Sequence, residues 1–166
     1  MLEGSPLEGA TVKTLSCSSF DEATGTLTLN FSDAQTSIEA GKPYIVKWAG
    51  GENIENPVFT GVTIKAEYHA VATDKVSFTG SYMAFPLEAN DRTMLYMGAD
   101  NKLYYPDAAM TVGACRAVFV LNGITAGAPN DQTTNPQTTN PVRAFVLNFG
   151  DGEQTSILSL YGHQGL

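Results

Sequence analysis

The alternation of apolar and polar residues is the dominant pattern along this chain. Within residues 26–31 every second residue is large and apolar, which gives one apolar face and one polar face at the two-residue period of a β-strand. Further runs rich in β-branched and aromatic residues, each flanked by Gly, Pro, Asn or Asp, predict strands over residues 44–48, 58–64, 76–85 and 94–97. We therefore expect an all-β chain of short strands.

Turn signals place one hairpin and one short helical segment. The sequence Gly98-Ala99-Asp100-Asn101 separates the strand at 94–97 from another at 103–105, and this spacing predicts a hairpin. After Pro106, Asp107 is able to cap one or two helical turns over residues 107–110 before Gly113 ends them. No longer helix is expected.

Two segments are near-copies of each other. Residues 116–122 read Arg-Ala-Val-Phe-Val-Leu-Asn and residues 143–148 read Arg-Ala-Phe-Val-Leu-Asn, so both are apolar on both faces, as in central strands that are covered on each side. Between them, residues 126–141 carry no large apolar side chain and repeat Gln-Thr-Thr-Asn-Pro twice. Such a segment buries too little surface to offset its ordering entropy, and we expect a mobile surface loop inserted in a single β domain of residues 1–166.

Many short strands with frequent turns favour an antiparallel two-sheet sandwich or a curved barrel-like variant.

The net charge limits the classes of partner that such a domain is expected to bind. The chain has 17 acidic and 9 basic residues, for a net charge of -8. This excess opposes binding to nucleic acid and to anionic lipid surfaces. No apolar run approaches the roughly 20 residues of a membrane-spanning helix, so membrane insertion is not expected.

The residues that usually carry catalysis or bind metals are few and scattered. His69 and His163 are the only histidines and Cys17 and Cys115 the only cysteines, and none stands in a nucleophile or zinc motif. We therefore predict no catalytic residues and no cofactor. The two cysteines are expected to be small buried apolar residues, with a single disulfide bridge as the alternative.

Asp151-Gly152-Glu153 places two carboxylates on a glycine turn, which makes Asp151 and Glu153 weak calcium candidates. A strand-connecting turn is the favoured interpretation, because the glycines at 150 and 152 supply unusual backbone angles.

Sugar binding would require exposed aromatic residues with polar neighbours. Trp48, Tyr96, Tyr104 and Tyr105 are the aromatic residues considered for that role, with core packing as the alternative for each. Alternation puts Tyr104 and Tyr105 on opposite faces of one strand, so at most one lies in the core if the other face is solvated. A glycosidase would need a carboxylate pair, and nothing singles out two among the acids.

Several segments resemble stretches of large surface proteins of Bacteroides-type gut bacteria: residues 39–48, 56–64, 75–82, 93–106 and 145–153. Their order resembles the C-terminal β module of those proteins, over roughly residues 25–157. Such parents are often repeat-bearing or adhesin-like, so the resemblance implies export and surface display, and it carries over no catalytic residues. This chain itself holds no leucine-rich repeats.

The combined expectation is a non-catalytic extracellular or cell-surface module with a structural or adhesive role. Its partners would be a glycan, a host or matrix protein, or other domains of its parent. A carbohydrate-binding module is the alternative, and a glycosidase is a more remote one.

Overall fold

The computed structural model describes residues 2–48, 55–98, 102–127, 141–150, 154–157 and 161–163. This part of the chain contains strands and no helix. The strands are β1 (Thr11–Lys13), β2 (Leu15–Asp21), β3 (Thr26–Phe31), β4 (Ile45–Lys47), β5 (Val71–Ala72), β6 (Val76–Ser81), β7 (Phe85–Leu87), β8 (Met94–Met97), β9 (Leu103–Pro106), β10 (Met110–Val112), β11 (Arg116–Leu121), β12 (Ala144–Asn148), β13 (Gln154–Ile157) and β14 (Tyr161–His163).

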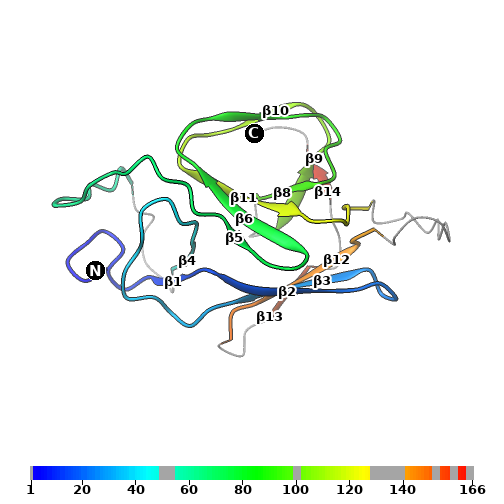
Figure 1. Cartoon of the computed structure of the whole chain (residues 1–166), viewed down its shortest axis with the longest axis horizontal. Coiled ribbons are helices and arrows are strands. Elements are labelled where there is room, and N and C mark those ends of the chain that lie inside the picture. Colours follow the sequence, from blue (N-terminus) through cyan, green and yellow to red (C-terminus); the bar gives the residue numbers. More distant parts are fainter. Residues whose placement is uncertain are drawn as a thin grey trace.

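Two sheets form the body of the molecule. One has the strand order β14-β9-β8-β11-β6-β5 and the other the order β13-β12-β3-β2. Figure 1 shows the second sheet below the first, and one apolar core joins the facing surfaces. The predicted all-β class is confirmed, and the sandwich is the architecture that these sheets adopt.

The alternation of apolar and polar residues determines which face of a strand is buried. Leu27 and Leu29 of β3 are fully buried, whereas the residues between them on the other face are half-buried. On the opposite sheet, Phe78 of β6 lies directly across from Phe119 of β11 in the strand register. Their rings stack with centroids 4.4 Å apart. Large apolar side chains from both sheets therefore fill the middle of the sandwich.

A third layer covers the other face of the six-stranded sheet. Strands β7 and β10 pair with each other and arch over β8 and β11, at the top of Figure 1. Leu87 and Val112 from this layer form a second apolar cluster with Val118 of β11. The central strand β11 is thus covered on both faces, as its sequence predicts.

Three expectations for secondary structure were wrong. The strand expected over residues 76–85 ends at Ser81, and β7 begins separately at Phe85. Residues 58–64 form no strand, and Ile64 there is 83% exposed. The apolar pattern is present, but no neighbouring strand pairs with it among the described residues. Residues 107–110 form no helical turn, because the chain bends at Asp107 and Ala108 and then enters β10. The pairing of β10 with β7 outweighs a short capped turn.

The expectation of buried cysteines was also wrong. Both thiols are free and exposed. Cys17 lies on the edge strand β2, beside a β-bulge. Cys115 lies in the turn before β11, with a φ of 56°. A position on an edge strand and a position in a turn leave both cysteines exposed to solvent.

Backbone contacts hold together the two ends of the polar insertion over residues 126–141. Ala126 is buried and forms a parallel β-bridge with Val142, and the amide of Gly127 donates to the Val142 carbonyl at 2.8 Å. Residues 128–140 lie outside the described residues, so the expected mobile loop stays a prediction.

In the part of the chain that the structure describes, no helix has the length and apolarity needed to cross a membrane.

Candidate functional site

A hollow opens where the core of the sandwich stops being filled. Phe78, Phe119 and Leu95 face one another across β6, β11 and β8 and are all buried. Two residues further along the same face, Gly80 lies directly opposite Ala117. A hydrogen atom and a methyl group stand there in place of two phenyl rings. The missing side-chain volume leaves a pocket of about 430 Å³.

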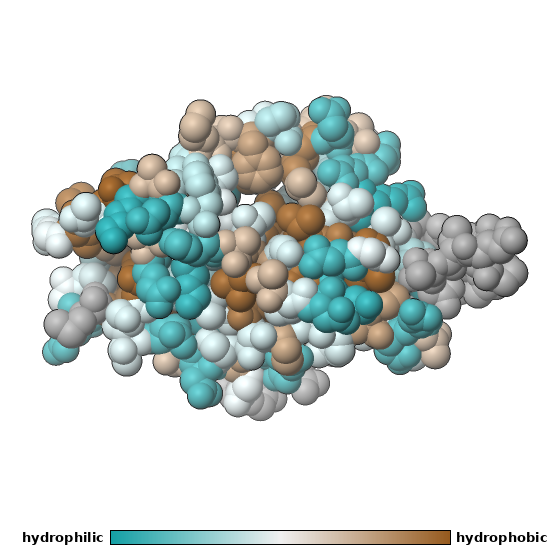
Figure 2. Space-filling view, in the orientation of Figure 1, coloured by the Kyte–Doolittle hydropathy of each residue, from teal (hydrophilic) through white to brown (hydrophobic). Residues whose placement is uncertain are grey.

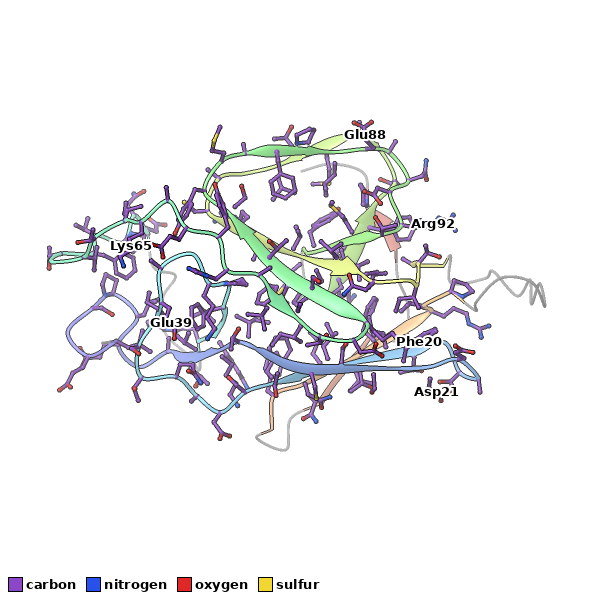
Figure 3. The ribbon with its side chains drawn as sticks, in the orientation of Figure 1. Phe20, Asp21, Glu39, Lys65, Glu88 and Arg92 are labelled. Carbon is purple, nitrogen blue, oxygen red and sulfur yellow. The ribbon has the colours of Figure 1, made fainter. Side chains whose placement is uncertain are left out.

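The segment 41–46, which we call the strap, forms one wall of this pocket. Tyr68 and Tyr82 form another, with ring centroids 5.3 Å apart and planes inclined by 55°. Figure 3 places Glu39, which precedes the strap, at the opposite end of the molecule from the β2–β3 turn at Asp21. The full lining is Gly41, Lys42, Pro43, Tyr44, Ile45, Val46, Tyr68, Phe78, Gly80, Ser81, Tyr82, Met97, Cys115, Arg116, Ala117 and Phe119.

Specific backbone contacts hold the strap in place. The Thr14 hydroxyl donates to the Pro43 carbonyl at 3.0 Å, and the His69 amide donates to the Gly41 carbonyl at 3.1 Å. Gly41 has a φ of +77°, and a Cβ there would lie 2.0 Å from the Glu67 carbonyl oxygen. Only glycine fits this junction. The wall of the pocket is therefore built by chain geometry as well as by side chains.

Some polar groups of the pocket are engaged within the chain. The Ser81 hydroxyl donates to the Met83 carbonyl at 2.6 Å and accepts from the Met83 amide at 3.1 Å. The Tyr44 hydroxyl accepts from the Glu39 amide at 3.1 Å, and the Lys42 ammonium lies 3.7 Å from the Glu39 carboxylate. The phenols of Tyr68 and Tyr82 and the Arg116 guanidinium are further polar groups of the lining.

The acidic, imidazole and amide side chain types are absent from the lining, which contains no Asp, Glu, His, Asn or Gln. The lining does include the Cys115 thiol, the Lys42 ammonium and the Arg116 guanidinium. Within the described residues, no three metal-ligating side chains come together. Most of the remaining side chains of the lining are aromatic or aliphatic.

Apolar side chains also reach the surface around this site. Val46 is 45% exposed, Met97 is 36% exposed and Tyr68 is 58% exposed. Figure 2 shows apolar residues between hydrophilic ones across the middle of the visible face, and again at the far left. The segment that carries Lys65 lies on that left side (Figure 3).

The four aromatic residues considered for sugar binding do not gather at one place. Tyr104 and Tyr105 are both buried, which removes them as exposed platforms in this structure. The layer of β7 and β10 explains this burial, because it covers the face that the sequence left open to solvent. Tyr96 is half-buried and stacks on Tyr104 with centroids 5.9 Å apart. Trp48 follows β4 and is 36% exposed, outside the pocket lining.

Of the remaining histidine and carboxylate candidates, the structure describes the side chain of His69, which lies outside the pocket lining. Asp151 and Glu153 lie outside the described residues, so the calcium interpretation stays a prediction. His69 is exposed, and its imidazole lies 3.2 Å from the Glu67 carboxylate. The side chain of His163 lies outside the described residues.

Sequence reasoning missed the pocket tyrosines at 44, 68 and 82. One signal was present: Gly80 interrupts the run of larger residues in β6, and the second residue of β11 is the small Ala117. Only the pairing register brings these two small residues opposite each other. That register is a long-range property and is not readable from either strand alone.

No family model matches the chain, and neither a curated protein nor a solved structure matches it significantly.

Proposed function

We propose that this chain is a non-catalytic binding module with an adhesive role in a larger cell-surface protein. The pocket over Gly80 and Ala117 is its binding site. The single observation that carries the proposal is a preformed pocket of about 430 Å³ with a mostly aromatic and aliphatic lining. Ligand sites are typically concave and apolar with few polar groups, and this volume lies in their usual range. Surface display rests on the resemblance of the sequence segments to exported proteins.

A pure spacer would not need such a hollow. Filling it would require only larger residues at two strand positions, and a larger β-branched residue at position 80 would suit a strand better than glycine does. The exposed apolar residues around the site, Val46, Tyr68 and Met97, also favour an interaction surface. The pocket therefore supports an adhesive role over a structural one.

Carbohydrate binding is the second candidate function. The observation in its favour is the pair of rings at Tyr68 and Tyr82 in the pocket wall, since sugars stack on exposed aromatic faces. The sequence candidates Trp48, Tyr96, Tyr104 and Tyr105 give it less support, because they lie in separate or buried places.

Retention on arrays of immobilised glycans and extracellular-matrix proteins tests the proposal. The variant Gly80→Val places a branched side chain in the pocket, and a Cβ at Gly80 would come no closer than 3.8 Å to its neighbours, so the fold should be kept. Met83→Ala is the matched control, because Met83 is an exposed apolar residue outside the pocket lining. We expect the wild type and the control to be retained on at least one surface and Gly80→Val to be released.

Equal retention of all three proteins would contradict a role for the pocket. No retention on any surface would support the spacer instead. Release of sugar from a glycan would overturn the non-catalytic assignment.

A further inference from the structure

The polar atoms of the pocket indicate which class of ligand, a sugar or an apolar group, the pocket is suited to bind. Each sugar hydroxyl that enters a pocket gives up hydrogen bonds to water, and an unreplaced hydrogen bond costs about 1–3 kcal/mol. Sugar sites meet this need with carboxylate and amide side chains, and none lines this pocket. The Ser81 hydroxyl is engaged with Met83, and Tyr44 already accepts from the Glu39 amide. The Arg116 guanidinium can only donate, and the phenols of Tyr68 and Tyr82 are further polar groups of the lining. The hydroxyls of a sugar would therefore find no carboxylate or amide oxygen among the lining side chains to accept their hydrogen bonds.

The floor and walls of the pocket suit a flat apolar group better than a sugar. Phe119 and Phe78 stack at the filled end, Ala117 and Gly80 leave the hollow, and Tyr68 closes one side. An apolar cavity of roughly 150 Å³ accommodates one benzene ring. The volume of about 430 Å³ here accordingly suits two rings with room for their attachment.

We infer that the pocket binds an apolar group of about two rings that is poor in hydrogen-bonding atoms, and that it selects against sugars. This inference rests on the proposed function, since it specifies the ligand class of the same site. The group could belong to a free small molecule or to an aromatic side chain of a partner protein. Both sources share the chemistry that the pocket recognises.

Ligand-observed saturation-transfer NMR separates the two parts of one probe. The probe is 2-naphthyl β-glucoside, compared with 2-naphthol and methyl β-glucoside. We expect saturation of the naphthyl protons and not of the sugar protons, binding of 2-naphthol, and no binding of methyl β-glucoside. Gly80→Val and, independently, Ala117→Leu should each weaken naphthyl binding at least tenfold, because they occupy the space the rings would take. Met83→Ala should leave it unchanged.

A second pair of probes identifies the source of the group. N-acetyltryptophanamide and N-acetylalaninamide differ by one two-ring side chain, and we expect the former to bind at least tenfold more tightly. Affinity above that of 2-naphthol assigns the group to a partner protein, and affinity below it assigns the group to a free molecule. Either result supports the inference.

Three outcomes would overturn it. Saturation of sugar protons, with binding of methyl β-glucoside lost in Gly80→Val, would make the pocket a sugar site and leave the proposed binding function standing. Failure of both naphthyl probes to bind would overturn the ligand class, while array retention lost in Gly80→Val would still support the binding function. Naphthyl binding that persists in both pocket-filling variants would place it elsewhere on the protein.

Discussion

Two neighbouring rows of one sheet face differ in what fills them. In the first row, Phe78 lies opposite Phe119, and both rings are buried against the four-stranded sheet. In the second row, two residues along, Gly80 lies opposite Ala117 beneath the strap. The backbone ladder is the same in both rows. Only the side-chain volume changes, from two phenyl rings to a hydrogen atom and a methyl group.

This difference shows how one pair of strands serves stability and binding. The filled row removes apolar surface from water and so contributes to the free energy of unfolding. The unfilled row buries less apolar surface and so contributes less to the free energy of unfolding. The space that it leaves forms the pocket. Because the ladder continues through Ser81 and Arg116, the hollow has a rigid floor. The strap then provides a wall that is fixed at Gly41 and Pro43.

The largest expected effect comes from emptying the filled row. Phe119→Ala removes a ring that is 2% exposed and stacked on Phe78, and large-to-small changes of this kind cost about 3–5 kcal/mol. Urea unfolding should show that loss in the free energy of unfolding. Tyr82→Ala, in the pocket wall, is the control and should cost only about 1 kcal/mol, because its main ring contact is with the exposed Tyr68. Equal losses for the two variants would refute the contrast between the rows.

A pair of glycine substitutions gives a smaller effect and tests the wall. Gly41→Ala combines a positive φ with a Cβ 2.0 Å from a carbonyl oxygen, so we expect a loss of about 1–3 kcal/mol. Gly80→Ala places its Cβ in ordinary contact distance and should be neutral or stabilising by up to about 1 kcal/mol. Thermal unfolding of both variants is the measurement. A stable Gly41→Ala protein would mean that the strap is not fixed at this junction.

Much of the fold follows from the sequence because it is encoded locally. The alternation in residues 26–31 produced β3 with the predicted bounds, and the turn at Gly98 separates β8 from β9, which pair antiparallel. The doubly apolar segment at 116–122 produced β11, buried on both faces. In each case the side chains of one short segment determine which face is buried.

The failures share a different cause. Residues 58–64 have a strand-like pattern, but a strand also needs a partner, and pairing is decided by the rest of the chain. At most one of Tyr104 and Tyr105 was expected in the core if the other face of their strand were solvated, and both are buried. The pocket could not be predicted from the sequence for the same reason, because it depends on the pairing register that brings Gly80 opposite Ala117. Long-range packing, rather than local propensity, decides all three.

The smallest expected effect concerns a residue packed beneath that covering layer. Burial raises the pKa of the Tyr96 phenol, and the nearby Asp107 carboxylate and Tyr104 add to the increase. The neutral phenol is therefore favoured in the folded state. The stability this contributes is present below the unfolded pKa of about 10 and is lost as the pH rises from there through the higher folded pKa. Phenolate absorbance followed against pH should show a late-titrating component that is missing in Tyr96→Phe.

The variant Asp107→Asn tests the cause of this shift. Removing the carboxylate takes away one source of the increase, so the late component should move toward the usual tyrosine range while burial keeps part of the shift. Tyr96→Phe should also lose less stability than the wild type as the pH rises above about 10, because it has no phenol to ionise in the unfolded state. If Tyr96→Phe instead loses amplitude only in the usual tyrosine range and keeps the late component, Tyr96 ionises as an exposed residue does, and the layer of β7 and β10 does not shield it from water.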